Sequence, residues 1–238
     1  MLAHGQIINP TQNGLLAALR PDEYERLRRH FEPIHLPQGK VIYEASGAVR
    51  HVYFLTGGVA SLLSTTADGS TVEVAMIGSE GFLGIPAVLQ ADVSPYRIIV
   101  QVRGGGVRLR AGLLRDEFDR CGHFQRLLLR YTHALLTHVS QSAVCNRFHT
   151  VEERLCRWLL VTRDCVCSDS FDLTQEFLSY MLGVPRTSVT AVAGALQRAG
   201  LIRYRRGRIT ITNGAGLGAT SCECYWVIRD EMSRHLAA

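Results

Sequence analysis

The stretch LTQEFLSYMLGVPRTSVTAVAGALQRAGLIRYRRGRITIT, residues 173–212, decides the fold of the second half of this chain. Thr174 is a suitable N-cap for a short helix that ends at Gly183. Pro185 stands at the start of a second helix, where its missing N–H costs nothing, and Gly200 terminates that helix. LIRY and ITIT then flank a basic turn, so the stretch predicts two helices followed by a β-hairpin, which is a winged helix-turn-helix.

The spacing of side chains in these helices separates a buried face from an exposed one. The apolar residues recur at helical intervals and should form the buried faces: Phe177, Leu178, Met181, Leu182, Val189, Val192, Ala193 and Leu196. The first turns of the second helix carry polar residues on the outward side, where a recognition helix meets base edges and phosphates. We predict base contacts from Arg186, Thr187 and Thr190, and backbone contacts from Thr174, Ser188, Arg205, Arg206 and Arg208.

The charge of this window indicates its partner. The chain carries a net charge of +5, and residues 173–212 alone hold six arginines against the single acid Glu176. Such an excess is typical of a surface that binds a polyanion. A solvated basic face would explain the charge alone equally well, and a winged helix can also bind protein. A basic hairpin beside a polar helix start favours double-stranded DNA.

The first half of the chain has a different hydrophobic period. A short helix is predicted over residues 21–31, and short β-rich runs broken by glycines fill residues 34–110. HVYFLT, Gly57 and Gly58, VASLLST, the Asp68–Gly69 turn and STVEVAMI together predict two successive hairpins. We therefore expect an α+β chain whose N-terminal domain is an antiparallel β-roll or jelly roll.

A long helix is predicted over about residues 123–146. Its apolar and small residues alternate at spacings of four and three, as in the seam of a coiled coil: Phe124, Leu128, Tyr131, Leu135, His138, Ser142 and Cys145. Pairing with a second copy is the natural use of this seam. The alternative is a helix packed on its own β-roll.

The long helix leads directly into the winged helix-turn-helix. Thr150 and Glu153 offer a capping box for a new helix, which makes the boundary a helical hinge. The predicted organisation is a sensor β-roll (1–122), a dimerisation helix and hinge (123–149) and a DNA-binding domain (150–238).

These motifs, in this order, resemble the Crp/Fnr family of bacterial transcription regulators over nearly the whole chain. The most specific are LTQEFLSYMLGVPRTSVT, GLIRYRRGRI, the hinge sequence CNRFHTVEERL and CECY. The resemblance implies a homodimer that reads a palindromic operator and contacts RNA polymerase. Arg186 matches the family's main base-reading arginine, and Ser188 and Thr174 match backbone-contacting positions. Thr187 stands where the family usually has glutamate, so the family's common operator sequence is not expected.

The sensor half departs from the family's cyclic-nucleotide members. Those members resemble one another in a Gly-Glu pair that holds the ribose and an Arg-Ser pair that holds the cyclic phosphate. The matching residues here are Gly84 with Ile85 and Pro95 with Tyr96, so both charged anchors are missing. Arg97 lies one residue past the phosphate position, and strand parity points it the other way. We expect an effector pocket at these positions that does not take cyclic AMP.

The sequence leaves open which signal the sensor half detects. The alternatives are another small ligand, haem, cysteine redox chemistry or no effector at all. Five histidines are candidate haem ligands by residue type alone: His35, His51, His123, His133 and His138. The N-terminal cysteine cluster of oxygen-sensing relatives is missing, because no cysteine precedes Cys121.

The seven cysteines lie in the second half of the chain. Cys165 with Cys167 and Cys222 with Cys224 could supply four thiolates, but Cys-x-Cys is not the usual ligand spacing. We therefore expect no metal and no cofactor.

Composition predicts a soluble globular protein, and the lack of catalytic motifs argues against an enzyme. The chain is 47% hydrophobic without a long apolar run, and its start lacks the pattern of a signal peptide, so we expect a cytoplasmic protein without a membrane partner. A metal-dependent enzyme on a β-barrel would need a His-x-His pair, which the sequence lacks. Nor does the sequence contain a nucleotide loop or a GxSxG elbow, so we expect no catalytic activity.

Overall fold

The computed structural model describes residues 2–3 and 6–236. The first half folds into a β-roll with short helices: β1 (Leu2–Ala3), β2 (Gln6–Ile7), η1 (Pro10–Gln12), α1 (Gly14–Ala17), α2 (Pro21–Arg28), β3 (Glu32–Leu36), β4 (Val41–Tyr43), β5 (His51–Thr65), β6 (Thr71–Ile77), β7 (Phe82–Leu83), α3 (Ile85–Val88), β8 (Arg97–Arg110) and α4 (Ala111–Phe118). The second half is mainly helical: α5 (His123–Phe148), α6 (Val151–Val166), β9 (Ser170–Asp172), α7 (Gln175–Leu182), α8 (Arg186–Arg198), β10 (Ile202–Arg205), β11 (Arg208–Ile211), α9 (Gly214–Thr220) and α10 (Cys224–Arg234). The α+β fold class is confirmed.

The β-roll is antiparallel, as predicted. Its strands follow the order β3-β8-β5-β6, with β4 paired to β8 and β7 paired to β5. The turn at Asp68 and Gly69 is confirmed, since Thr65 pairs with Thr71 across it and Gly69 has a φ of +86°. Glycine adopts this backbone conformation without steric cost.

The hairpin predicted at Gly57 and Gly58 is wrong. β5 runs through both residues as one strand and pairs along its length with β8, with shifts of register around Gly57. The glycines allow the two backbones to approach closely: a Cβ on Gly104 would lie only 2.0 Å from the Gly57 carbonyl oxygen. Glycine in a β-rich sequence is typical of a turn or of two backbones that approach closely. Here the glycines allow the backbones of β5 and β8 to approach closely.

The helices agree with the sequence pattern more closely. α5 extends from His123 to Phe148, and the predicted capping box begins α6, where the Glu153 carboxylate accepts from the Thr150 backbone N–H at 2.7 Å. α2 ends at Arg28, three residues before the predicted end at residue 31. Pro33 disfavours helical backbone in the residue before it, and β3 already begins at Glu32.

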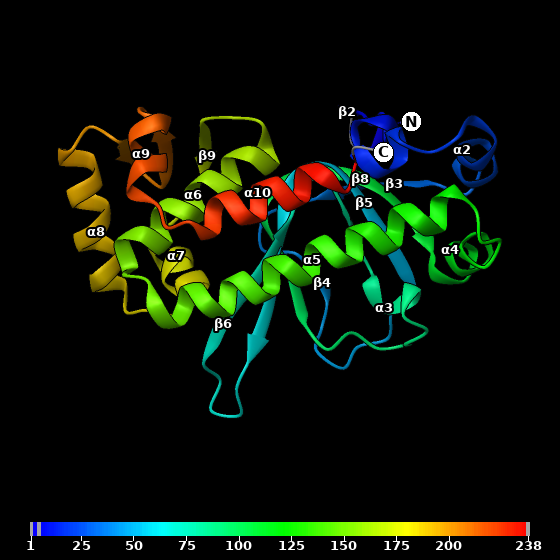
Figure 1. Ribbon diagram of the computed structural model, residues 1–238, viewed down its shortest axis with the longest axis horizontal. Helices are drawn as coiled ribbons and strands as arrows, with labels where there is room; N and C mark the ends of the chain where they lie inside the picture. Colours follow the sequence, from blue (N-terminus) through cyan, green and yellow to red (C-terminus); the bar gives the residue numbers. More distant parts are fainter. Residues whose placement is uncertain (1, 4–5, 237–238) are drawn as a thin grey trace.

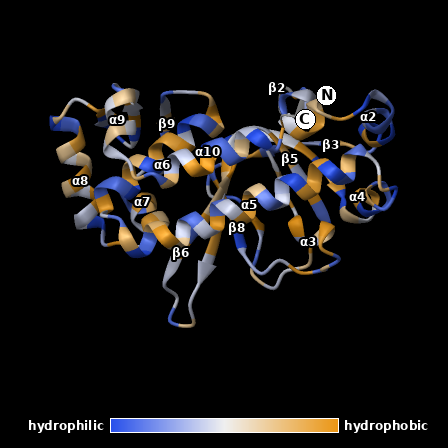
Figure 2. Ribbon diagram, in the orientation of Figure 1, coloured by the Kyte–Doolittle hydropathy of each residue, from blue (hydrophilic) through white to orange (hydrophobic). Residues whose placement is uncertain are grey.

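The predicted seam of α5 faces the chain's own core. All seven of its residues are buried within one protomer: Phe124, Leu128, Tyr131, Leu135, His138, Ser142 and Cys145. The alternative, a helix packed on its own β-roll, holds for the part from Phe124 to Leu135, whereas Cys145 packs against Cys222 and Cys224. Because the whole face is buried within the protomer, its assignment as the intersubunit seam is wrong. Both arrangements produce nearly the same period, so spacing alone cannot separate them. Figure 2 shows hydrophobic and hydrophilic bands alternating along α5.

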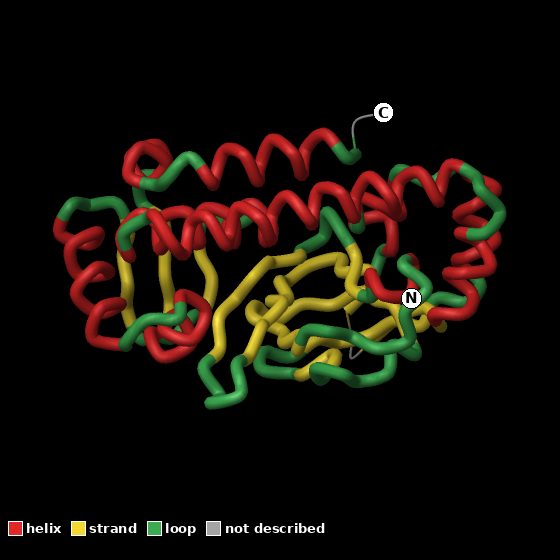
Figure 3. Tube along the Cα trace, turned by 60° about the horizontal axis from the view of Figure 1, so that its bottom comes forward, coloured by secondary structure: helices red, strands yellow, loops and turns green. Residues whose placement is uncertain are grey.

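The C-terminal helix returns to the sensor half. α10 packs along α5, and the two helices run side by side in Figures 1 and 3. Arg130 of α5 donates to the Arg234 carbonyl oxygen at 2.7 Å, and a ring nitrogen of His235 lies 3.0 Å from the Glu80 carbonyl oxygen. The segment from α10 to His235 thus contacts both α5 and the β-roll, although in sequence it follows the winged helix-turn-helix.

We expect Gly104→Ala to destabilise the β-roll by roughly 1–3 kcal/mol or more, because the new methyl group would collide with backbone rather than with a movable side chain. Gly112→Ala is the matched control, because an added Cβ there meets no described atom within 4 Å. Urea denaturation measures both variants. Equal stability of the two would contradict the close approach of β5 and β8.

Candidate DNA interface and effector pocket

The helix-turn-helix forms from local signals. The Thr174 hydroxyl accepts from the Phe177 N–H at 3.1 Å and caps α7, and Gly183 ends α7 with a φ of +59°. Pro185 caps α8 without a side-chain hydrogen bond. Val189 and Leu196 of α8 are buried in the same cluster as Leu178 of α7, which fixes the angle between the two helices.

The outward side of α8 presents the predicted reading residues. Arg186, Thr187 and Thr190 are exposed, and Ser188 is partly buried. The Thr190 hydroxyl lies 2.8 Å from Oε1 of Gln175, which joins the start of α7 to α8. Sequence reading missed Gln175, although it directly follows the predicted cap.

The hairpin extends this surface. β10 and β11 pair through Arg205 and Arg208, and Arg206 and Gly207 turn between them with positive φ. The Leu173 N–H donates to the Gly207 carbonyl at 2.6 Å and ties the turn to the start of α7. β9, which sequence reading missed, adds a third strand beside β11.

The wing arginines are not equivalent. Arg205 and Arg206 are exposed, and neither forms an ion pair within the described part of the chain. Arg208 lies 3.6 Å from the Asp172 carboxylate, so its charge is partly compensated. Arg186 has no such acidic partner among the residues that the structure describes. Arg186, Arg205 and Arg206 are therefore exposed cations that form no ion pair within the described part of the chain.

A cavity of about 440 Å³ lies between the β-roll, α3 and α5. Gly84, Ile85, Pro95 and Tyr96 line it, as predicted for an effector pocket. Arg97 is also among the residues predicted for the pocket, and that assignment is wrong: it does not line the cavity and instead pairs with Glu44 at 3.2 Å, because its strand parity points it away.

The lining of this effector pocket is apolar. Among its described residues, only Tyr96 and Thr132 carry a polar side-chain atom. Leu135, Leu136 and Val139 of α5 close one wall. A cyclic phosphate would find no cationic side chain in this lining.

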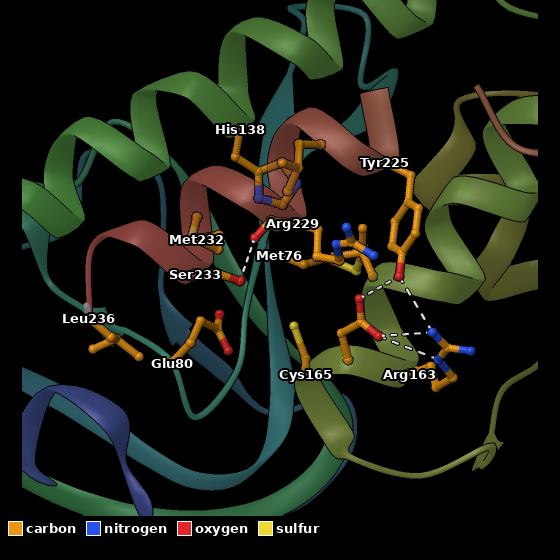
Figure 4. A pocket seen from close by; sticks show the side chains of 13 residues that line it. Met76, Glu80, His138, Arg163, Cys165, Tyr225, Arg229, Met232, Ser233 and Leu236 are labelled. Atoms are coloured by element: carbon orange, nitrogen blue, oxygen red, sulfur yellow. Dashed lines mark hydrogen bonds and ion pairs between the residues drawn. The ribbon is translucent and has the colours of Figure 1, made fainter. Parts of the chain in front are cut away.

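A second cavity, of about 480 Å³, lies between α5, α6, β6 and α10 (Figure 4). His138, Glu80 and Cys165 face it. Burial lowers the pKa of His138 to about 3, so this imidazole is neutral near pH 7, and burial raises the pKa values of Glu80 and Cys165. Neither ring nitrogen of His138 has a hydrogen-bond partner in the described chain.

The other candidate haem ligands are dispersed. His123 bonds the Ala18 carbonyl at 3.0 Å, and His133 lies 3.1 Å from a Glu231 oxygen. His35 belongs to β3, and His51 begins β5. The structure therefore does not gather these histidines around either cavity.

The cysteines are gathered differently from the sequence expectation. Cys165 and Cys167 do not join Cys222 and Cys224. Instead, Cys145 at the end of α5 and His149 just after it lie with Cys222 and Cys224, and the four donor atoms are all within 4.8 Å of one another. The i, i+4 spacing of Cys145 and His149 on one helical face was the signal that sequence reading missed.

Comparison with known families gives two matches in chain order. Residues 33–120 match the cyclic nucleotide-binding domain, and residues 153–220 match the Crp-like helix-turn-helix domain. α5 joins the two regions. The chain belongs to the Crp/Fnr family of bacterial transcription regulators. Members of this family bind DNA in a sequence-specific way through the domain that here contains α7, α8 and the wing.

Solved Crp/Fnr structures share the fold. FixK2 from Bradyrhizobium japonicum is 14% identical, with a TM-score of 0.68 over 81% of this chain and 98% of that chain. The c-di-GMP responsive regulator CLP from Xanthomonas campestris is 15% identical, with a TM-score of 0.66 over 81% and 99%. TTHB099 from Thermus thermophilus is 17% identical, with a TM-score of 0.58 over 79% and 96%. A search of curated proteins finds no match.

None of the helices in the described part of this Crp/Fnr chain has the length and apolar character needed to span a bilayer.

We expect Arg186→Ala to cost about 1–3 kcal/mol per half-site on the cognate operator and much less on scrambled DNA, because it removes base contacts. Arg205→Ala is the matched control. Loss of its charge should weaken binding about equally on all sequences and make the salt dependence shallower. Fluorescence anisotropy over a salt series measures both. Unchanged discrimination by folded Arg186→Ala would contradict the assignment of α8 as the reading helix.

Proposed function

We propose that this Crp/Fnr regulator acts as a homodimer that reads a palindromic operator with one α8 per half-site, under the control of an apolar small molecule. The observation that carries the DNA part is the exposed, unpaired Arg186 at the start of α8, beside the exposed Arg205 and Arg206 of the wing. We assign no catalytic activity, in keeping with a family of DNA-binding regulators.

The geometry of such a dimer sets the form of the operator. Two recognition helices related by a two-fold axis sit about 34 Å apart and read half-sites one helical turn apart. Thr174 and Ser188 lie near the reading residues and supply hydroxyls for phosphate contacts. We further propose that the bound dimer contacts RNA polymerase in the cytoplasm, as the family resemblance implies.

The surface that we propose for dimerisation is the exposed strip of α5. Leu129 and Leu136 are 47% and 64% exposed, which is unusual for leucine in a folded helix. Thr132, Val139 and Ala143 continue the same strip at spacings of three and four, and none of them is fully buried. This strip lies one residue further along the chain than the buried face, and a paired helix would cover it.

The effector that we propose is apolar and uncharged. The lining of the effector pocket offers aliphatic and aromatic contacts and hydroxyl groups but no charged anchor. Leu136 and Val139 line this pocket and also belong to the proposed dimer strip. A ligand there would therefore bear directly on the helix that joins sensor to DNA-binding domain.

We expect Leu136→Glu to dissociate the dimer. Two copies would lose about 3 kcal/mol or more of apolar burial and gain facing charges, so the dissociation constant should rise at least about 100-fold. Because Leu136 is exposed in the protomer, the variant should still fold. Val227→Glu on α10 is the matched control. Sedimentation equilibrium separates the outcomes, and an unaltered dimer in Leu136→Glu would contradict the proposed strip.

We expect cyclic AMP to bind more weakly than about 1 mM, whereas a neutral apolar probe, N-phenyl-1-naphthylamine, should bind and fluoresce in the effector pocket. Ile85→Glu should weaken the probe at least about tenfold, because it places a carboxylate in the apolar lining. Calorimetry measures the affinity for the nucleotide, and fluorescence titration measures the affinity for the probe. A micromolar constant for cyclic AMP, or a probe insensitive to Ile85→Glu, would contradict an apolar effector.

A further inference from the structure

Four donor groups from two separate parts of the chain meet where α5 ends and α10 begins. Cys145 belongs to the last turns of α5, His149 caps that helix, and Cys222 and Cys224 flank the start of α10. The three thiols are buried and form a cluster of their own, apart from the two large apolar cores. We propose that Cys145, His149, Cys222 and Cys224 bind a single Zn²⁺ ion.

The distances suit one tetrahedral ion. The sulfur atoms of Cys145 and Cys222 are 3.5 Å apart, and the Cys224 sulfur lies 3.6 Å from Nδ1 of His149. Zinc bonds of about 2.3 Å to sulfur and about 2.0 Å to nitrogen place tetrahedral ligands roughly 3.5–3.8 Å apart. In a four-iron cluster each ligand binds its own iron, so the ligand atoms lie farther apart than they do around a single ion. Here the four donor atoms all lie within 4.8 Å of one another.

The ring nitrogen of His149 that points away from the thiols has a carboxylate partner, as histidines that bind zinc commonly do. Nε2 lies 3.3 Å from the carboxylate of Glu223, while Nδ1 faces the thiols. A carboxylate in this position fixes the tautomer and orientation of a ligating histidine and raises its basicity. Glu223 stands between Cys222 and Cys224, so the same short segment supplies two ligands and the group that orients a third.

A buried positive charge next to the thiols is a second, independent observation. Arg157 of α6 is only 4% exposed, and its Nε and Nη1 have no hydrogen-bond partner within the described chain. Its charge acts on the thiols of Cys145, Cys222 and Cys224. Three thiolates and a neutral imidazole around Zn²⁺ carry a net charge of −1, which would compensate this arginine. The charge of Arg157 also acts on the buried carboxyl of Glu73, whose pKa burial raises to about 8.

The position of the site gives it a structural consequence. α6 begins at Val151, two residues after His149, so the ion would fix the hinge between the sensor half and the DNA-binding domain. It would also fasten the start of α10 to the end of α5. Binding would release the thiol protons, because only thiolates ligate zinc.

Elemental analysis of the full-length protein, purified with a reductant and without added chelator, tests the proposal. We expect one zinc per chain in the wild type and in Cys167→Ser, whose thiol is exposed and outside the cluster. Cys145→Ser, Cys222→Ser and Cys224→Ser should each lose the ion. A metal-free wild type with three free cluster thiols and an unbound His149, a disulfide between cluster cysteines under these reducing conditions, or iron with inorganic sulfide would each overturn the proposal.

A titration keeps the test independent of variant folding. Co²⁺ added to the metal-free wild type should give the absorption of a tetrahedral thiolate complex at one equivalent, and Zn²⁺ should displace it. Glu223→Gln should weaken Co²⁺ affinity by roughly 10–100-fold while keeping the tetrahedral spectrum. Glu231→Gln on α10, which alters the pair of this carboxylate with His133 of α5, is the matched control. An octahedral spectrum, or equal affinities in the two variants, would contradict the assigned ligand set.

Discussion

The packing of one face of α5 on the chain's own β-roll is the constraint on which the rest of the structure depends. Tyr131 lies at its centre, with its ring 5.3 Å from that of Phe82 and 5.4 Å from that of His235. A Cβ on Gly81 would lie 2.2 Å from the Tyr131 ring, so the β-roll backbone approaches α5 as closely as glycine permits. This contact joins the sensor, the long helix and the C-terminal end.

That packing divides α5 into surfaces with different tasks. The buried face holds the protomer together, and the adjacent strip with Leu129 and Leu136 is the surface that we propose for a partner. The effector pocket opens against the same strip, and the cysteine cluster lies at the far end of the helix. A rotation of α5 by a fraction of a turn would therefore affect pocket, dimer and hinge together, which is a direct route from a ligand to the DNA-binding domain.

The second cavity shows how the C-terminal helix contributes to this arrangement. α10 covers His138, and that imidazole stays neutral at physiological pH because burial lowers its pKa to about 3. The Tyr225 hydroxyl donates to Asp164 at 2.9 Å and links α10 to α6. α10 thereby contacts both α5 and α6, so the orientation of α6 relative to α5 depends on contacts made by this helix.

The sequence by itself determined the elements whose signals are local. Thr174, Gly183 and Pro185 set the helix-turn-helix, Thr150 with Glu153 starts α6, and Asp68 with Gly69 turns a hairpin, because caps and turns depend on a few neighbouring residues. The α+β class, the long helix and the loss of both charged nucleotide anchors at Ile85 and Pro95 follow from the same kind of reading.

Only the tertiary structure decided what depends on distant partners. Gly57 reads equally well as a turn or as a close approach until β8 is placed opposite it. The period of α5 is the same for a face against its own β-roll and for a face against a second copy. Cys145 and Cys222 are 77 positions apart. Their meeting depends on how α10 folds back along α5, and no local spacing encodes that path.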